Sequence, residues 1–303
     1  MKHHRALLLA GLALAAGCRE AKRPVDALRA ADPIMVRNAG FATPESVYHD
    51  PLTDVYLISN INGSPLAVDD NGFISVLSAN GRDLTLKGID GAADSVTLNA
   101  PKGMAAIGEF FYVTDINTIR RFDRRTGAPR GDIPIPGATF LNDMVAGDDG
   151  SLYFTDSGLK AGPEGLVPSG TDAVYRLTPA GTLDTLARGD ELGRPNGIAL
   201  SGDSVWVVGY ASGELYRVAG GHKTDVVKLP KGGLDGLVIF SGEAFVSSWD
   251  GQAIFRGKLG GTLEVMLTGL PAPADIGHDL WRNRLLIPLF NDNEVRIVPL
   301  IPW

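Results

Sequence analysis

The sequence predicts an all-β protein, a six-bladed β-propeller, and three observations lead to that prediction. Glycine is abundant, at 38 of 303 residues, and clusters with Asp and Asn at turns. After residue 30 no long stretch spaces its apolar residues for a helix, whereas short β-branched and aromatic runs alternate with turns. The third observation is that these runs recur as a unit.

The repeated unit is clearest in "RPNGIALSGDSVWVVGYASGELYRV", which starts at Arg194. It has a tight start, a strand, a turn, an apolar strand, a second turn and a third strand. Similar units begin at "TPESVYHD", "APKGMAAI", "FLNDMVAG", "GLDGLVIF" and "PADIGHDL". Six units of this kind match the blades of a propeller, in which each sheet buries its faces only against its neighbours.

Each unit opens with a polar residue, here called its leading residue, shortly after the tight start. The leading residues follow one another at intervals of 39 to 57 residues, and the two longest intervals hold turn-rich inserts. They are Glu45, Lys102, Asn142, Asn196, Asp235 and Asp275.

The chain ends suggest how the ring closes. A short strand pattern, "PIMVRNAGF" at residues 33–41, precedes the first unit, while the last unit ends at "VRIVPLIPW" without an outer strand. We expect the N-terminal strand to complete the sixth blade, so that residues 33–303 form one propeller domain.

The first seventeen residues, "MKHHRALLLAGLALAAG", combine a basic start with a short apolar run, as export signals do. The sequence "LAAGC" resembles the bacterial lipoprotein signal, which predicts lipidation of Cys18 after cleavage and a tether over residues 18–32. A free cysteine behind an ordinary signal peptide is the alternative. Because residue 19 is Arg, we expect anchoring in the outer membrane, facing the periplasm. Cys18 is the only cysteine, which excludes disulfides and cysteine-ligated zinc.

The net charge of −7 argues against nucleic acid as a partner, because an acidic surface repels phosphate. We expect a monomer that takes a small-molecule substrate and meets the membrane only through its lipid anchor.

In a propeller the innermost strands line a central channel, so the leading residues of the six units should face one another at one end of it. Two carboxylates and two amides in this set offer oxygen ligands suited to a hard cation, Ca²⁺ first and Mg²⁺ second. These four residues are Glu45, Asn142, Asn196 and Asp235.

The segments "PES", "ND" with "GSLYFTDSG", "PNGIALS", and "LDG" with "VSSWDG" resemble the regucalcin and gluconolactonase family of six-bladed calcium-dependent hydrolases. The resemblance covers roughly residues 35–300. It implies that Glu45, Asn196 and Asp235 bind the metal and that Asn142 binds metal or contacts substrate. It also makes Asp235 the general base or nucleophile, with Asn142 as its catalytic partner.

Two residues depart from the family pattern. Sugar-lactone members carry an arginine where this chain has Phe140, which argues against a sugar substrate. Lys102 places a cation beside the expected metal. It either turns towards an anionic group of the substrate or replaces the metal by pairing with the carboxylates.

Asp275 and His278 are further candidates for substrate contact at the same end of the channel, and His278 could serve as a base or be a structural histidine. Phe140 and Trp249 either form an apolar wall for the ligand or belong to the core. The favoured function is a lipid-anchored, metal-dependent lactone or ester hydrolase. A non-catalytic ligand-binding or ion-binding propeller and a protein-binding scaffold are the alternatives.

Overall fold

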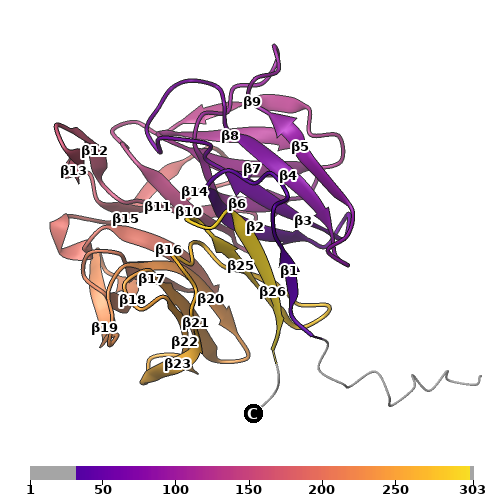
Figure 1. The fold of residues 1–303 in the computed structure, drawn as a ribbon. Coiled ribbons are helices and arrows are strands. Elements are labelled where there is room, and N and C mark those ends of the chain that lie inside the picture. Colours follow the sequence, from indigo (N-terminus) through magenta and orange to yellow (C-terminus); the bar gives the residue numbers. More distant parts are fainter. Residues whose placement is uncertain (1–31, 301–303) are drawn as a thin grey trace, which may run out of the picture. The chain divides into compact units, whose positions relative to one another are not determined.

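A computed structural model describes residues 32–300, and these residues form a six-bladed β-propeller, as the repeat predicts (Figure 1). Each blade is a four-stranded antiparallel sheet. A single 3-10 turn, Asp190–Leu192, is the only helical element in this part of the chain. None of the described residues forms a helix long and apolar enough to cross a bilayer. The lipidation site Cys18 and the leader lie outside the described residues.

In each of the first five blades the strands run outward from the channel in chain order. Blade 1 contains β2 (Pro44–Asp50), β3 (Val55–Asn60), β4 (Phe73–Ser78) and β5 (Leu84–Asp90). Blade 2 contains β6 (Pro101–Ile107), β7 (Phe110–Asp115), β8 (Thr118–Asp123) and β9 (Pro129–Pro134).

Blade 3 carries an insert. Its sheet contains β10 (Leu141–Ala146), β11 (Leu152–Asp156), β14 (Ala173–Leu177) and β15 (Leu183–Arg188). Between β11 and β14 the turn-rich insert of the sequence forms a separate hairpin of β12 (Leu159–Gly162) and β13 (Gly165–Pro168).

Blades 4 and 5 follow the regular pattern. Blade 4 contains β16 (Pro195–Ser201), β17 (Ser204–Gly209), β18 (Glu214–Ala219) and β19 (His222–Lys228). Blade 5 contains β20 (Leu234–Phe240), β21 (Glu243–Ser248), β22 (Ala253–Lys258) and β23 (Leu263–Thr268).

The sixth blade is built from both ends of the chain. It contains β24 (Gly277–Asp279), β25 (Arg284–Leu289), β26 (Glu294–Pro299) and β1 (Ile34–Val36). Figure 1 shows β1, in indigo, alongside β26, in yellow, and Ile34 pairs with Ile297 in antiparallel register. The closure predicted from the sequence is confirmed.

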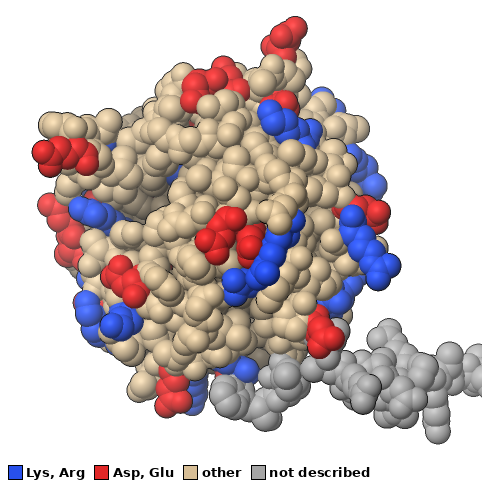
Figure 2. All heavy atoms as spheres, in the orientation of Figure 1, with Lys and Arg blue, Asp and Glu red and all other residues tan. Residues whose placement is uncertain are grey.

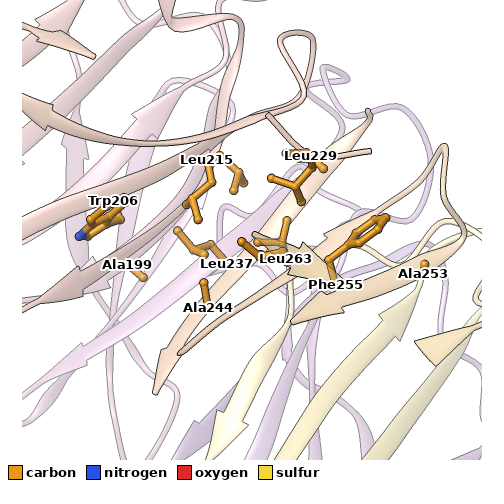
Figure 3. Close-up of a cluster of buried hydrophobic side chains, with 12 residues drawn as sticks. Ala199, Trp206, Leu215, Leu229, Leu237, Ala244, Ala253, Phe255 and Leu263 are labelled. Atoms are coloured by element: carbon orange, nitrogen blue, oxygen red, sulfur yellow. The ribbon is translucent and has the colours of Figure 1, made fainter. Parts of the chain in front are cut away.

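The hydrophobic core is divided into six clusters, each packed between two neighbouring blades. In the cluster between blades 4 and 5, Leu215 and Trp206 face Leu237 and Phe255 (Figure 3). Both faces of each sheet are therefore covered, which explains the nearly continuous apolar runs in the inner strands. Outside, acidic and basic side chains are scattered over the surface seen in Figure 2, and neither sign forms a large patch on this face.

The innermost strands of the first five blades share a β-bulge at the same place. The register shifts between the first and fourth residues of β2, β6, β10, β16 and β20. The two residues inside each bulge are the leading residue and the residue after it. A bulge re-aims side chains, which is how the leading residues come to face one end of the channel.

The residue after the leading one must be small where the strands approach most closely. A Cβ on Gly197 would lie 2.3 Å from the backbone oxygen of Asp235, and one on Gly103 would lie 2.5 Å from the Cα of Asp143. Glycine at these positions lets the backbones of adjacent inner strands touch, which narrows the channel.

Candidate metal and substrate site

Four buried oxygen atoms at one end of the channel have no hydrogen-bond partner. All four residues line one cavity, of about 310 Å³, and each is at most 6% exposed. The atoms are Oε2 of Glu45, Oδ1 of Asn142, Oδ1 of Asn196 and Oδ1 of Asp235. Burying an unpartnered polar atom is costly, so four of them in one cavity indicate a ligand-binding site.

The set suits a hard divalent cation. Carboxylate and amide oxygens are the donors that Ca²⁺ and Mg²⁺ prefer, and the two carboxylates match the charge of the ion. Nowhere in residues 32–300, this site included, do three or more His, Cys, Asp or Glu side chains gather as metal ligands, so the two amide oxygens must complete the donor set here. The residues expected to bind metal are thus the ones that the fold brings together, with their oxygens free.

The amide of Asn142 is oriented by its neighbour. Its Nδ2 lies 3.0 Å from Oγ of Ser157, and that hydroxyl lies 2.7 Å from the backbone oxygen of Pro195. Because the only hydrogen of Ser157 is donated to Pro195, Ser157 must accept from the amide nitrogen. The carbonyl oxygen of Asn142 is therefore the atom that faces the cavity.

The second strands of the blades fix the backbone of the leading residues. Thr155 Oγ1 donates to the backbone oxygen of Asn196 at 2.7 Å, and Thr114 Oγ1 donates to that of Asn142. The Asp that follows each threonine holds the turn before a leading residue. Asp156, for example, accepts from the backbone N–H of Phe140 at 2.9 Å. The recurring "TD" pair of the sequence therefore fixes the backbone at and before the leading residues.

Burial and mutual repulsion make the two carboxylates hard to ionise without a cation. The pKa of Glu45 is raised well above its usual value, first by burial and then by the charges of Asp235 and Asp275. Burial also raises the pKa of Asp235, followed by the charge of Asp275. Ionised, the pair attracts positive charge strongly.

Trp249 adds a donor to this region. Its indole N–H is buried and has no hydrogen-bond partner among the described residues. It lies close enough to Asp235 to lower the pKa of that carboxyl, although burial outweighs this effect. The residue lines the cavity, so it is a wall residue with a free donor rather than part of an inter-blade core.

Lys102 lies at the same cavity but does not pair with its carboxylates. Its Nζ donates to the backbone oxygens of Ala100 at 3.0 Å and Pro65 at 3.4 Å, and it stands 4.5 Å from the centre of the Phe140 ring. No carboxylate lies within ion-pair distance of it among the described residues. Burial lowers the pKa of Lys102, and the charge of Glu45 counteracts that effect. The ammonium is held in place without closing the cation site.

The walls of the cavity are largely apolar. Aromatic rings cover one side, where the Trp249 ring centre lies 6.2 Å from that of Tyr210 and 5.2 Å from that of Phe290. On the other sides are Phe140 and the β12–β13 hairpin, through Leu159 and Leu166. Phe140 therefore contacts the cavity, as expected for a substrate wall.

The expected position of Asp275 is wrong. Pro273 pairs with Leu289 and Gly277 with Leu286, which places Ala274, not Asp275, where the other blades have their leading residue. Ser46 pairs with Asp275, so these two are equivalent positions. Asp275 is one residue out of phase, and a one-residue step in a strand reverses the direction of the side chain.

Asp275 instead faces a second cavity, of about 640 Å³, at the opposite end of the inner strands. Its Oδ2 accepts from Ser46 Oγ at 2.5 Å, and it is hydrogen-bonded to Asp143. Asp143 also accepts from the backbone N–H of Met144 and of Ile198, at 2.6 and 2.7 Å. These side chains satisfy one another and join three blades.

His278 also lines this second cavity and lies away from the leading residues. Its ring packs 4.4 Å from that of Phe240, and Nε2 is 3.4 Å from Oδ1 of Asn283. Burial lowers the pKa of His278. The expectation that it sits beside the leading residues is wrong because β24 carries it along the strand towards the other end.

No family model matches the sequence, and no curated protein matches it either. Among solved structures, the chain is similar to a gluconolactonase from Xanthomonas campestris, with a TM-score of 0.67, 20% identity, and 92% of this chain and 94% of that chain covered. A luciferin-regenerating enzyme matches with a TM-score of 0.64, 15% identity and 88% and 96% coverage. A streptogramin B lyase matches with a TM-score of 0.61 and 14% identity, and the match covers 89% of this chain and 97% of the lyase.

These likenesses show the fold. They agree with the resemblance to the regucalcin and gluconolactonase family at the level of the six-bladed propeller, and they include lyases as well as hydrolases.

Some residues of the site were not predicted from the sequence, among them Ser157, Tyr210 and Arg194. Ser157 orients Asn142, and its place inside the segment "GSLYFTDSG" is the signal that points to it. Tyr210 and Arg194 line the cavity, and both lie inside the repeated unit that starts at Arg194, but neither occupies its leading position.

Proposed function

We propose that the protein is a divalent-metal-dependent hydrolase of small lactones or esters. The observation that supports this most directly is the set of four unpartnered oxygens in a cavity with apolar walls. Glu45, Asn142, Asn196 and Asp235 would hold the cation, Ca²⁺ by preference. When bound there, such an ion supplies Lewis acidity towards a carbonyl oxygen.

The residues of the chain would supply the rest of the chemistry. Asp235, whose burial makes ionisation costly, would accept a proton from the attacking water. Asn142, fixed by Ser157, would keep its carbonyl oxygen aimed into the cavity. The aromatic wall of Tyr210, Trp249 and Phe290 would exclude bulk water from the substrate.

The cavity favours small substrates with limited polarity. Its volume of about 310 Å³ admits a ring of a few atoms with one substituent, and Phe140 offers no hydrogen bonds to the hydroxyls of a sugar. We therefore expect simple lactones and aryl esters to be better substrates than gluconolactone.

The experiment is a hydrolysis assay of residues 32–303 with γ-lactones, aryl acetates and gluconolactone, in Ca²⁺, in Mg²⁺ and in EDTA. We expect turnover that EDTA abolishes and that Asp235→Asn reduces by about a thousandfold, as for loss of a catalytic base. Phe240→Leu, at a ring that packs against His278 of the second cavity, is a control that should keep its activity. Metal-independent turnover, or full activity in Asp235→Asn, would contradict the proposal.

A binding protein with the same ring is the second candidate, and the fixed Lys102 favours it because a nearby cation weakens metal affinity. Calcium binding without turnover of any substrate would support this candidate. For the full chain we further propose export and lipid anchoring through Cys18, with the propeller tethered at the outer membrane. Loss of membrane association in Cys18→Ser tests that proposal.

A further inference from the structure

Arg194 lines the cavity of the leading residues, but its side chain makes no hydrogen bond and no ion pair within residues 32–300. Its backbone is fixed, since the N–H donates to Oδ2 of Asp172 at 2.7 Å and the carbonyl accepts from Tyr210 at 2.9 Å. The guanidinium has no hydrogen bond and no ion pair within residues 32–300, and the side chain is only partly exposed. An arginine that faces a cavity without a partner is available to a ligand.

The turn does not require an arginine. Arg194 has a left-handed backbone, with φ of 58°, and so do the equivalent positions before β2, β20 and the sixth blade. The residues there are small: Thr43, Gly233 and Ala272, with φ of 50°, 60° and 47°. The left-handed backbone is thus a feature of the repeated turn, and glycine is the residue that adopts it at the lowest free-energy cost. The long cationic side chain is specific to the blade that carries Asn196.

The charges of the cavity favour an anionic ligand. Two carboxylates, Glu45 and Asp235, face two cations, Lys102 and Arg194, so a bound divalent ion leaves the cavity with an excess of positive charge. Lys102 is only 1% exposed and already donates to two carbonyls, which limits its reach. Arg194 is the cation that remains free. Its charge also acts on the wall, where it opposes the burial that raises the pKa of the Tyr210 phenol.

The geometry points to a role for Arg194 in substrate selection. We propose that it recognises a carboxylate on the substrate, so that the preferred substrates are small lactones or esters with an apolar body and one carboxylate. This inference rests on the proposed hydrolase function. A guanidinium fork binds a carboxylate through two parallel hydrogen bonds, while the aromatic wall covers the apolar part. Arg194 would act on binding and would take no part in bond cleavage.

The kinetic test uses two lactones of nearly equal size, 5-oxotetrahydrofuran-2-carboxylate and γ-valerolactone, which carry a carboxylate and a methyl group at the same ring carbon. We expect Arg194→Gln to lower kcat/KM for the first by about 10- to 100-fold, the usual weight of a charge-assisted hydrogen bond, and to leave the second within about threefold. Arg194→Lys should recover part of the loss. Arg125→Gln is the matched control, since the exposed side chain of Arg125 makes no hydrogen bond or ion pair within residues 32–300 and the residue lies in a turn away from the cavity.

Calorimetry separates this inference from the proposed reaction. Tetrahydrofuran-2-carboxylate has no carbonyl in its ring and cannot be hydrolysed, so its binding needs no chemistry. We expect it to bind the wild type and Arg125→Gln alike and at least tenfold more weakly to Arg194→Gln, in Ca²⁺ and in EDTA. This result supports the role of Arg194 even if no lactone is hydrolysed.

Two outcomes would overturn the inference while leaving the hydrolase intact: equal kcat/KM for both lactones, or equal binding of the carboxylate by wild type and Arg194→Gln. Absence of carboxylate binding to the wild type would also overturn it. If Arg194→Gln folds poorly, Arg194→Gly can replace it, because glycine suits the left-handed backbone at this position. We expect Arg194→Gly to show the same losses.

Discussion

The two ends of the central channel are built from adjacent residues of the same strands, yet they differ in how their polar atoms are satisfied. At one end Asn142 and Glu45 leave oxygens without partners. At the other end their immediate neighbours Asp143 and Ser46, together with Asp275, bond to one another and to backbone N–H groups. Burial of acidic side chains alone therefore does not identify a ligand site. A cluster of buried acceptor oxygens without hydrogen-bond partners does.

The largest effect should separate the two ends by metal affinity. Asp235→Ala removes one ligand and one negative charge, and we expect Ca²⁺ affinity to fall by about a thousandfold, because both ligand number and charge set the affinity. Asp275→Ala, its counterpart at the other end, should change it by about tenfold at most. Isothermal calorimetry measures both. Equal losses would mean that the two ends form one site.

Removing Lys102 should strengthen metal binding. An ammonium that lines the same cavity repels a divalent ion, and burial strengthens this repulsion relative to water. We therefore expect Lys102→Met to raise Ca²⁺ affinity by about 10- to 100-fold, measured in the same calorimeter. Weaker binding in this variant would show that Lys102 supports the ring, and a melting curve without metal checks its fold.

Ser157→Ala should produce a smaller loss. The variant frees the amide of Asn142 to rotate, and loss of an orienting hydrogen bond typically reduces metal affinity by about tenfold or more. Ser151→Ala, in the same blade but away from the cavity, serves as control. If Ser157→Ala binds Ca²⁺ like the wild type, the amide orientation does not depend on this serine.

The smallest expected effect is a change of stability with pH that arises from Asp275, at the end of the channel where the acids are hydrogen-bonded. Burial raises the pKa of Asp275 to about 7, against about 3.9 for an unfolded Asp. Between about pH 4 and 7 the folded state therefore keeps a proton that the unfolded state loses, so this group lowers stability as pH rises to about 7. In EDTA, the melting temperature of the wild type should fall by a few degrees more than that of Asp275→Asn between pH 5 and 8. Parallel curves would contradict this.

The fold and most of the site could be predicted because both are periodic. The repeat places Glu45, Asn142, Asn196 and Asp235 at equivalent positions, and equivalent positions in a closed ring must face one another. The sixth blade broke the period, since its β24 is short and starts late, at Gly277. A shift of one residue cannot be seen in a turn-rich segment such as "PAPADIG", and it sent Asp275 to the other end.

The residues that the sequence could not supply act through contacts that have no period. Ser157 is important because its hydroxyl reaches a carbonyl of the next blade, and Arg194 because its side chain finds no partner. Both depend on how close two segments of the chain come, which the local pattern does not record. Lys102 is held by backbone carbonyls, which every residue carries, so the sequence could not predict what fixes its ammonium.

The pairing of β1 with β26 also sets the order of assembly. The first strand of the ring is synthesised long before its partner, so it must wait until almost the whole chain is available, and the loop that it closes has the largest sequence separation in the molecule. Five blades can form entirely from local hairpins, whereas the sixth forms β24, β25 and β26 locally and needs the distant β1 to complete its sheet. We therefore expect the pairing of the three residues of β1 with β26 to be the last step in forming the ring and the first pairing lost when the ring opens.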